Sequence, residues 1–166
     1  VMITGNAGDV MRESVHAAIT FLRKRAGAAA DGGFRFDAHL HVGEGGVSKD
    51  GPSAGLAIAL AIASAHHNRP MPAGWAATGE VGILGDVRPV GALREKLAAA
   101  RREKLRHVLV PGRNRPDIEA LPADAIAELT LHYVDTIEAA MALCFPDGAH
   151  GDGAKRRSVE KSATKR

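Results

Sequence analysis

The chain has a single cysteine, Cys144, and few aromatic residues. One cysteine excludes an intrachain disulfide and fits a reducing compartment. Phe, Trp and Tyr make up 4% of the 166 residues, so Ala, Val, Leu and Ile must fill the core. No apolar run reaches the length of a membrane span, and no secretory signal is visible. A Gly-x-x-x-x-Gly-Lys-Ser/Thr motif is also missing, which excludes ATP hydrolysis by a P-loop in this chain.

Charge is distributed unevenly along the chain. The net charge is +3, but residues 149–166 carry +4 and residues 1–148 carry −1. Residues 147–166 are glycine-rich, then basic and polar, without an apolar period, so we expect a disordered basic tail. The overall composition, 45% hydrophobic and 25% charged, is typical of a globular protein, and we expect one domain over residues 1–146.

Hydrophobic periodicity predicts helices that alternate with strands. Helices are expected at residues 10–25, 53–66, 91–100, 116–121 and 135–144, the first capped by Asp9. Strands are expected at residues 34–42, 75–84, 87–90, 107–111 and 129–134, with a hairpin turn at Gly85-Asp86. This α/β-like alternation predicts an α/β or α+β domain.

A serine precedes the most apolar of these helices, in the motif Lys49-Asp-Gly-Pro-Ser-Ala-Gly55. Asp50 is a natural N-cap and Pro52 fits a first turn, which places Ser53 inside that turn. The Ser53 hydroxyl then lies near unpaired backbone N–H groups and the positive end of the helix dipole. Such a setting stabilises an oxyanion, as acyl transfer requires; the alternative is a solvated first-turn serine.

A lysine lies 43 residues after Ser53, on the apolar side of a predicted helix. The apolar stripe of residues 91–100 runs through Leu93, Leu97 and Ala100, and Lys96 follows Leu93 by three positions. A lysine at this position can extend its ammonium to water. Alternatively it is desolvated, which lowers its pKa and lets it act as a general base near neutral pH.

A third motif, Ala77-Thr-Gly-Glu80, lies between the serine and lysine motifs. With Lys49–Gly55 and Arg88–Leu97, it closely resembles the proteolytic domain of Lon, the ATP-dependent protease. Residues 8–14 resemble the start of that domain, and the resemblance extends over residues 4–145. The serine motif together with a lysine at the matching separation is highly specific for this family.

The resemblance implies a Lon-type fold, with helices packed on small mixed sheets. It also implies that Ser53 is the nucleophile and Lys96 its general base, with the Thr78 hydroxyl helping to position Lys96. The family's Gly-Gly-Leu-Lys-Glu-Lys reads Gly91-Ala-Leu-Arg-Glu-Lys96 here, which spares the lysine.

The family's first strand and its ATPase module precede this domain. We therefore expect a truncated N-terminal strand and a fragment of a longer protease. ATP and Mg²⁺ are expected only for the missing module, and no cofactor or metal is expected for this chain.

Two histidines and two carboxylates are further candidates for the site. His39 and His41 share one face of a strand that leads into the serine loop, so they border the site; as a metal pair they lack a third ligand with matching spacing. Asp50 could instead orient a histidine in a Ser–His–Asp arrangement, although Lys96 already supplies a base. Glu80, beside Thr78, completes the supporting residues.

Two functions of different class remain open. The first is a serine endopeptidase that cleaves unfolded or damaged proteins and belongs to a homo-oligomer, a hexameric ring by the resemblance, in the bacterial cytoplasm or the mitochondrial matrix. The second is a non-catalytic scaffold or nucleic-acid module that uses the basic tail for weak, non-specific DNA contact. A scaffold has no reason to keep both Ser53 and Lys96, which favours the enzyme.

Overall fold

The computed structural model describes residues 1–26, 37–43 and 47–146. It shows an α+β domain in which helices pack on small parallel and antiparallel sheets, as predicted. The expected connection after the first helix, the strand residues 34–36 and the tail 147–166 lie outside the described residues.

A three-stranded parallel sheet divides the core into two parts. Its strands, in the order β3-β6-β7, are β3 (Trp75–Ala77), β6 (His107–Pro111) and β7 (Thr130–Val134). Because successive side chains of a strand point to opposite faces, Leu109 packs in one hydrophobic cluster while Val108 and Val110 pack in the other.

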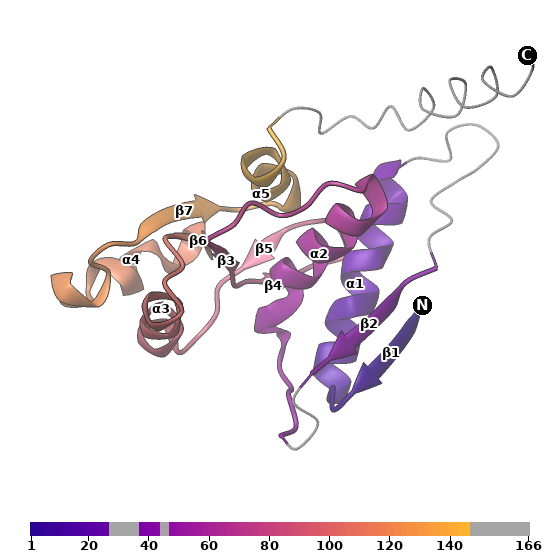
Figure 1. The fold of residues 1–166 in the computed structure, drawn as a ribbon, viewed down its shortest axis with the longest axis horizontal. Helices are drawn as coiled ribbons and strands as arrows, with labels where there is room; N and C mark the ends of the chain where they lie inside the picture. The colour runs from indigo at the N-terminus through magenta and orange to yellow at the C-terminus, as the bar shows by residue number, and fades with distance from the viewer. Residues whose placement is uncertain (27–36, 44–46, 147–166) are drawn as a thin grey trace, which may run out of the picture.

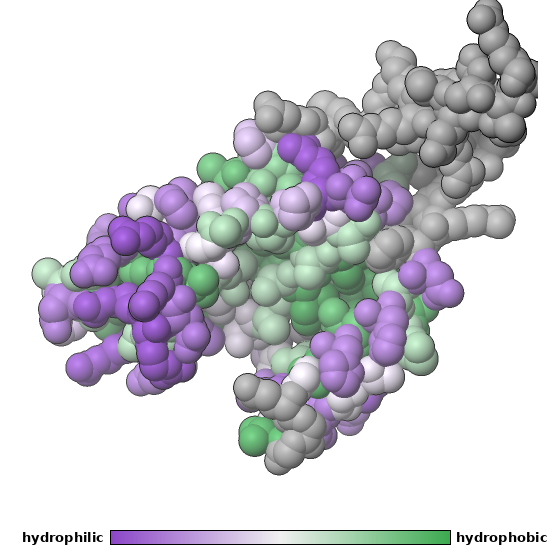
Figure 2. Space-filling model, viewed as in Figure 1, coloured by the Kyte–Doolittle hydropathy of each residue, from purple (hydrophilic) through white to green (hydrophobic). Residues whose placement is uncertain are grey.

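Each face of this sheet is covered by helices (Figure 1). The larger cluster contains α1 (Asp9–Ala26), α2 (Gly55–His67) and α5 (Ile137–Cys144). The smaller cluster contains α3 (Leu93–Arg102) and α4 (Arg115–Glu119), which follows the 3-10 turn η2 (Gly112–Asn114). Another 3-10 turn, η3 (Ala123–Ala125), precedes β7. Polar side chains gather over the α3 and α4 side of the molecule in the space-filling view (Figure 2).

A second sheet pairs the start of the chain with the strand before the serine loop. The strands β1 (Met2–Gly5) and β2 (His39–Val42) are parallel, with Ile3 beside Leu40. Strand β1 was not predicted. In β2, Leu40 and Val42 pack against the core and the two histidines are exposed, so the predicted alternation is confirmed for these four residues.

The strand expected at residues 75–84 is wrong as one element. The chain leaves the parallel sheet after Ala77 and starts a separate hairpin, β4 (Glu80–Val81) with β5 (Val87–Arg88). The expected two-residue turn at Gly85-Asp86 is instead a longer loop, closed by a hydrogen bond from the Gly82 N–H to the Asp86 carbonyl at 2.9 Å.

Most helix predictions are confirmed within a few residues. The stripe of α3 buries Leu93, Leu97 and Ala100 as expected, and Cys144 is buried in α5. Asp9, the predicted cap of the first helix, lies inside the first turn of α1. The carbonyl of the preceding residue, Gly8, accepts the N–H of Arg12. Over the described ranges, none of the helices has the length and apolar character needed to cross a membrane.

Three rings stack on one face of the parallel sheet. The Trp75 indole lies nearly parallel to the rings of His107 and His132, with centroids 4.8 and 4.6 Å away. His107 Nδ1 and His132 Nε2 are hydrogen-bonded at 3.1 Å, so one of these nitrogens must be unprotonated. Burial, and secondarily His107, lowers the pKa of His132.

This lowered pKa makes the fold acid-sensitive. Below about pH 6.5 the unfolded chain binds a proton at His132 before the folded chain does, so the free energy of unfolding falls as pH falls. We expect His132→Phe, which keeps a ring for stacking, to weaken this pH dependence between pH 7.5 and 5. Part of the pH dependence should remain in this variant, because burial also lowers the pKa of His66 and His67. Urea denaturation at several pH values measures the free energy of unfolding. If it changes with pH equally in the wild type and in His132→Phe, the prediction is wrong.

Candidate active site

Ser53 lies in a tight turn directly before the central helix. The turn is the 3-10 segment η1 (Pro52–Ala54), and α2 begins at Gly55, so Ser53 precedes the α-helix instead of lying in its first turn as predicted. Gly51, at φ +102, takes the cap position without a side-chain cap bond. The start of α2 still places the positive end of the helix dipole near the serine, but the N–H groups of Gly55 and Leu56 already bond the carbonyls of Pro52 and Gly79.

Asp50 does not cap the serine helix, so that prediction is wrong. Its Oδ1 accepts the N–H of Met11 at 3.0 Å, near the start of α1, and the N–H of Gly51 at 2.8 Å. These bonds, that of Gly51 first, hold the pKa of Asp50 below its ordinary value. The sequence predicts a cap for the helix that directly follows the residue. Asp50 instead bonds Met11, which lies 39 residues earlier in the chain.

The serine loop is fastened to the start of α1 by main-chain bonds as well. The Lys49 N–H donates to the Asn6 carbonyl at 2.9 Å, and the Gly8 N–H donates to the Lys49 carbonyl at 2.8 Å. A side chain at Gly8 would place its Cβ 2.3 Å from Asp50 Cγ, so only glycine allows this approach. Asp50 therefore holds the loop to α1, while the structure does not show it orienting a histidine.

The main chain of Ser53 is held by the segment between β3 and β4. The Ser53 carbonyl accepts the Gly79 N–H at 2.9 Å and the Thr78 hydroxyl at 3.1 Å. The Gly79 carbonyl in turn accepts the Leu56 N–H at 2.9 Å. Thr78 is buried, and the bond that its hydroxyl makes fixes Ser53; its predicted help to Lys96 stays a prediction.

Ser53, Thr78 and Lys96 line one cavity of about 370 Å³. The cavity lies between the start of α2, the edge strand β3 and the inner face of α3. Its other walls are mostly apolar and come from Ala54, Ala57, Ala76, Ala77, Leu93, Leu97, Ala99, Ala100, Leu105 and Val108, with Glu103 the remaining charged side chain. The structure thus brings together three of the predicted site residues, from segments far apart in the sequence.

Lys96 is half-buried on the cavity side of α3. Its Nζ donates to the Gly91 carbonyl at 2.7 Å, one turn back along the chain. Burial lowers the pKa of the Lys96 ammonium, with a smaller opposing effect from Glu95. The lysine is thus partly desolvated, and its ammonium bonds the protein main chain.

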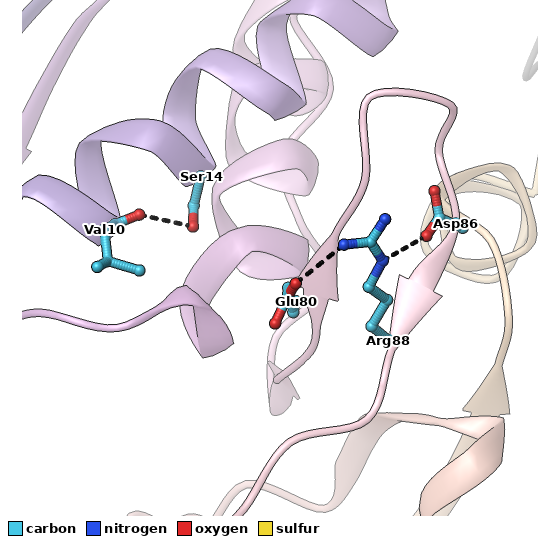
Figure 3. A network of polar contacts seen from close by, with 5 residues as sticks. All are labelled: Val10, Ser14, Glu80, Asp86 and Arg88. Atoms are coloured by element: carbon cyan, nitrogen blue, oxygen red, sulfur yellow. Dashed lines mark hydrogen bonds and ion pairs between the residues drawn. The ribbon is translucent and has the colours of Figure 1, made fainter.

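The other predicted supporting residues lie away from this cavity. Glu80 forms an ion pair with Arg88 across the hairpin, and Arg88 also pairs with Asp86, two residues before it (Figure 3). His39 Nε2 and His41 Nδ1 both lie within hydrogen-bond distance of the Thr4 hydroxyl, at 2.6 and 2.9 Å. In the part of the chain that the structure describes, no group of three or more His, Cys, Asp or Glu side chains could hold a metal ion.

The sequence reading missed Gly79 as a residue that shapes the site. A Cβ at Gly79 would lie 2.8 Å from Val87 Cγ1 and 3.3 Å from Leu56 Cβ. The available signal was a glycine inside a predicted strand, which indicates a close approach of another segment of the chain. The strand prediction passed over that signal.

The sequence matches a described protein family. A model of the Lon protease (S16) C-terminal proteolytic domain matches residues 1–146. Lon protease of Erwinia amylovora is 43% identical over 151 residues, which are 89% of this chain and 19% of the relative. Lon protease of Escherichia coli strain K12 is 42% identical over the same shares, and that of Aquifex aeolicus is 42% identical over 83% of this chain and 18% of the relative. The chain thus spans less than a fifth of the length of these relatives.

The close approach at Gly79 predicts that alanine destabilises the fold at Gly79 but not at Gly91. Gly79→Ala should overpack the junction and lower the free energy of unfolding by about 1–3 kcal/mol. Gly91→Ala is the matched control, because a Cβ there would meet nothing within 4 Å. We expect it to be neutral or slightly stabilising. Equal urea midpoints for the two variants would contradict this account of the junction.

Proposed function

We propose that this chain, which belongs to the Lon protease (S16) C-terminal proteolytic domain family, is a serine endopeptidase domain in which Ser53 and Lys96 form the catalytic dyad. The observation that carries the proposal is that both residues line one largely apolar cavity, where burial lowers the pKa of Lys96. A general base must be unprotonated to act, and a desolvated lysine meets that requirement closer to neutral pH.

The proposed reaction begins with proton transfer from Ser53 Oγ to the neutral Lys96 amine. The Ser53 oxygen attacks the carbonyl carbon of the scissile peptide bond, and the backbone N–H of the serine turn, together with the positive end of the α2 dipole, stabilises the oxyanion. The C–N bond then breaks, and Lys96 returns its proton to the leaving amine. Water, deprotonated by Lys96, attacks the acyl-serine ester. The C–O bond to Ser53 breaks, Lys96 returns the proton to Ser53 Oγ, and the new carboxyl terminus is released.

The bonds to the Ser53 carbonyl support this assignment. A nucleophile accelerates acyl transfer only if its main chain is held in the attacking geometry. Two donors fix that carbonyl from the segment that follows the edge strand β3. The same segment contributes Thr78 to the cavity wall. The nucleophile and the cavity are therefore parts of one rigid junction.

Family membership supports the proposals about the substrates and partners of the whole protein. We propose that unfolded or damaged proteins are the substrates and that the full-length protein is a homo-oligomer, arranged as a hexameric ring. ATP and Mg²⁺ would act on an ATPase module outside this chain, and the location would be the bacterial cytoplasm, or the mitochondrial matrix in a eukaryote. The DNA-binding alternative depends on residues 149–166, which lie outside the described residues.

The dyad predicts two inactive but folded variants. Ser53→Ala removes the nucleophile, and Lys96→Met fills a similar volume without accepting a proton, so each should abolish hydrolysis of a fluorogenic peptide. Circular dichroism should show an unchanged fold. Labelling of the wild type by a serine-directed inhibitor should map to Ser53. Retained activity in Lys96→Met, together with loss in His39→Ala or His41→Ala, would replace the dyad by a histidine-based mechanism.

The pKa of Lys96 predicts the shape of the pH profile. Activity should rise as pH rises, because the proportion of neutral Lys96 increases, and the apparent pKa should lie below the ~10.4 of a free lysine. The kcat/KM of peptide cleavage between pH 5 and 10 measures this. A rising limb centred near pH 6 would point to a histidine as the base.

A further inference from the structure

We propose that Asn114 is a positioning residue for Lys96, because it fixes the main chain that receives the lysine side chain. This inference rests on the proposed catalytic role of Lys96. Asn114 lies at the end of η2, in the connection that follows β6, and it does not line the cavity that holds Ser53. Its side chain instead reaches the segment between β5 and α3, 24 residues away in the sequence.

Asn114 satisfies both main-chain polar groups of one residue, Val90. Its Oδ1 accepts the Val90 N–H at 2.9 Å, and its Nδ2 donates to the Val90 carbonyl at 3.1 Å and to Asp117 Oδ2 at 2.8 Å. Reversing the amide would place oxygen against oxygen and nitrogen against nitrogen, so the orientation is determined by its partners. Asn114 is 2% exposed, and a buried amide left without these bonds is costly.

Val90 directly precedes the carbonyl that binds the lysine. Lys96 Nζ donates to the Gly91 oxygen at 2.7 Å, and the Lys96 N–H donates to the Ala92 oxygen at 3.1 Å. Both of these acceptor residues are exposed. Ala92 also has a φ of 55°, a left-handed conformation that a residue other than glycine adopts at a cost. An exposed turn with this backbone requires an anchor, and the bonds between Asn114 and Val90 provide one at its first residue.

The consequence for Lys96 follows from the geometry of the turn. While Val90 is held, the Gly91 carbonyl has a defined direction and keeps the lysine Nζ beside the cavity wall. If the turn relaxes, the long side chain extends into water, where it is fully solvated. Burial then no longer disfavours the ammonium, so the pKa of Lys96 rises toward that of a free lysine and less neutral base is present at pH 7–8.

The test compares Asn114→Ala with a matched control in the full chain. Asp117→Ala removes one partner of Asn114 but leaves both bonds to Val90 intact. We expect Asn114→Ala to lower kcat for a short peptide about 100-fold with KM changed less than about threefold, and to shift the rising limb of the pH profile to higher pH. Asp117→Ala should leave kcat and the pH profile near those of the wild type.

A second readout does not depend on activity. In the Ser53→Ala background, the pKa of Lys96 is measured by NMR with ¹³Cε-labelled lysine, assigned by comparison with Lys96→Met. Asn114→Ala should raise this pKa, whereas Asp117→Ala should not. A lowered melting temperature with an unchanged pH profile and unchanged Lys96 pKa would show a purely structural role for Asn114 and overturn the proposal.

The remaining outcomes are separated by design. If Asn114→Ala does not fold, the double variant Asn114→Asp/Asp117→Asn is used. It keeps an acceptor for the Val90 N–H and reverses the bond between positions 114 and 117, but it removes the donor to the Val90 carbonyl. The Lys96 pKa should therefore rise above that of the wild type, and an unchanged pKa overturns the proposal. If Ser53→Ala remains active, the proposed function fails, and the NMR comparison still decides whether Asn114 positions Lys96.

Discussion

The pairing of the Thr78-Gly79 segment with the Ser53 carbonyl is the interaction on which the site depends. The Thr78 N–H still bonds the Leu109 carbonyl of the parallel sheet, at 3.0 Å, while its hydroxyl bonds Ser53. Gly79 then bonds the serine turn with its N–H and α2 with its carbonyl. Two residues therefore follow the end of β3, hold the proposed nucleophile and lead into the hairpin. Displacing this segment would disturb the sheet, the helix and the site together.

The cavity beside that junction gives the lysine its chemistry. The alanine and leucine side chains that line it cannot solvate an ammonium, and burial consequently lowers the pKa of Lys96. The apolar stripe of α3 that packs on the sheet also carries the lysine, so the hydrophobic contacts that stabilise the helix also place the proposed base. The helix face that stabilises the fold is thus also the face that carries the proposed base.

The two ends of the serine loop are restrained differently. On the amino-terminal side, Asp50 and the main chain of Lys49 bind the region around the start of α1. On the carboxyl-terminal side, Gly55 lies so close to β4 that a Cβ would be 2.8 Å from Val81 Cγ2. The serine turn is therefore fixed between a helix start and a strand. Such restraint on a loop residue is what a nucleophile requires, because misplacement by about 1 Å costs a large part of the rate.

The sequence by itself determined the elements whose residues interact with near neighbours. Helical and strand periods located α1, α3, β6 and β7 closely. The resemblance of the serine and lysine motifs to the Lon proteolytic domain pointed to the two central residues of the candidate site. Tertiary structure alone decided where the strand of residues 75–84 divides, which helix Asp50 serves and what holds Val90. Periodicity reports on contacts within a few residues, whereas these bonds join positions 24 to 39 residues apart. Their partners exist only once the chain has packed.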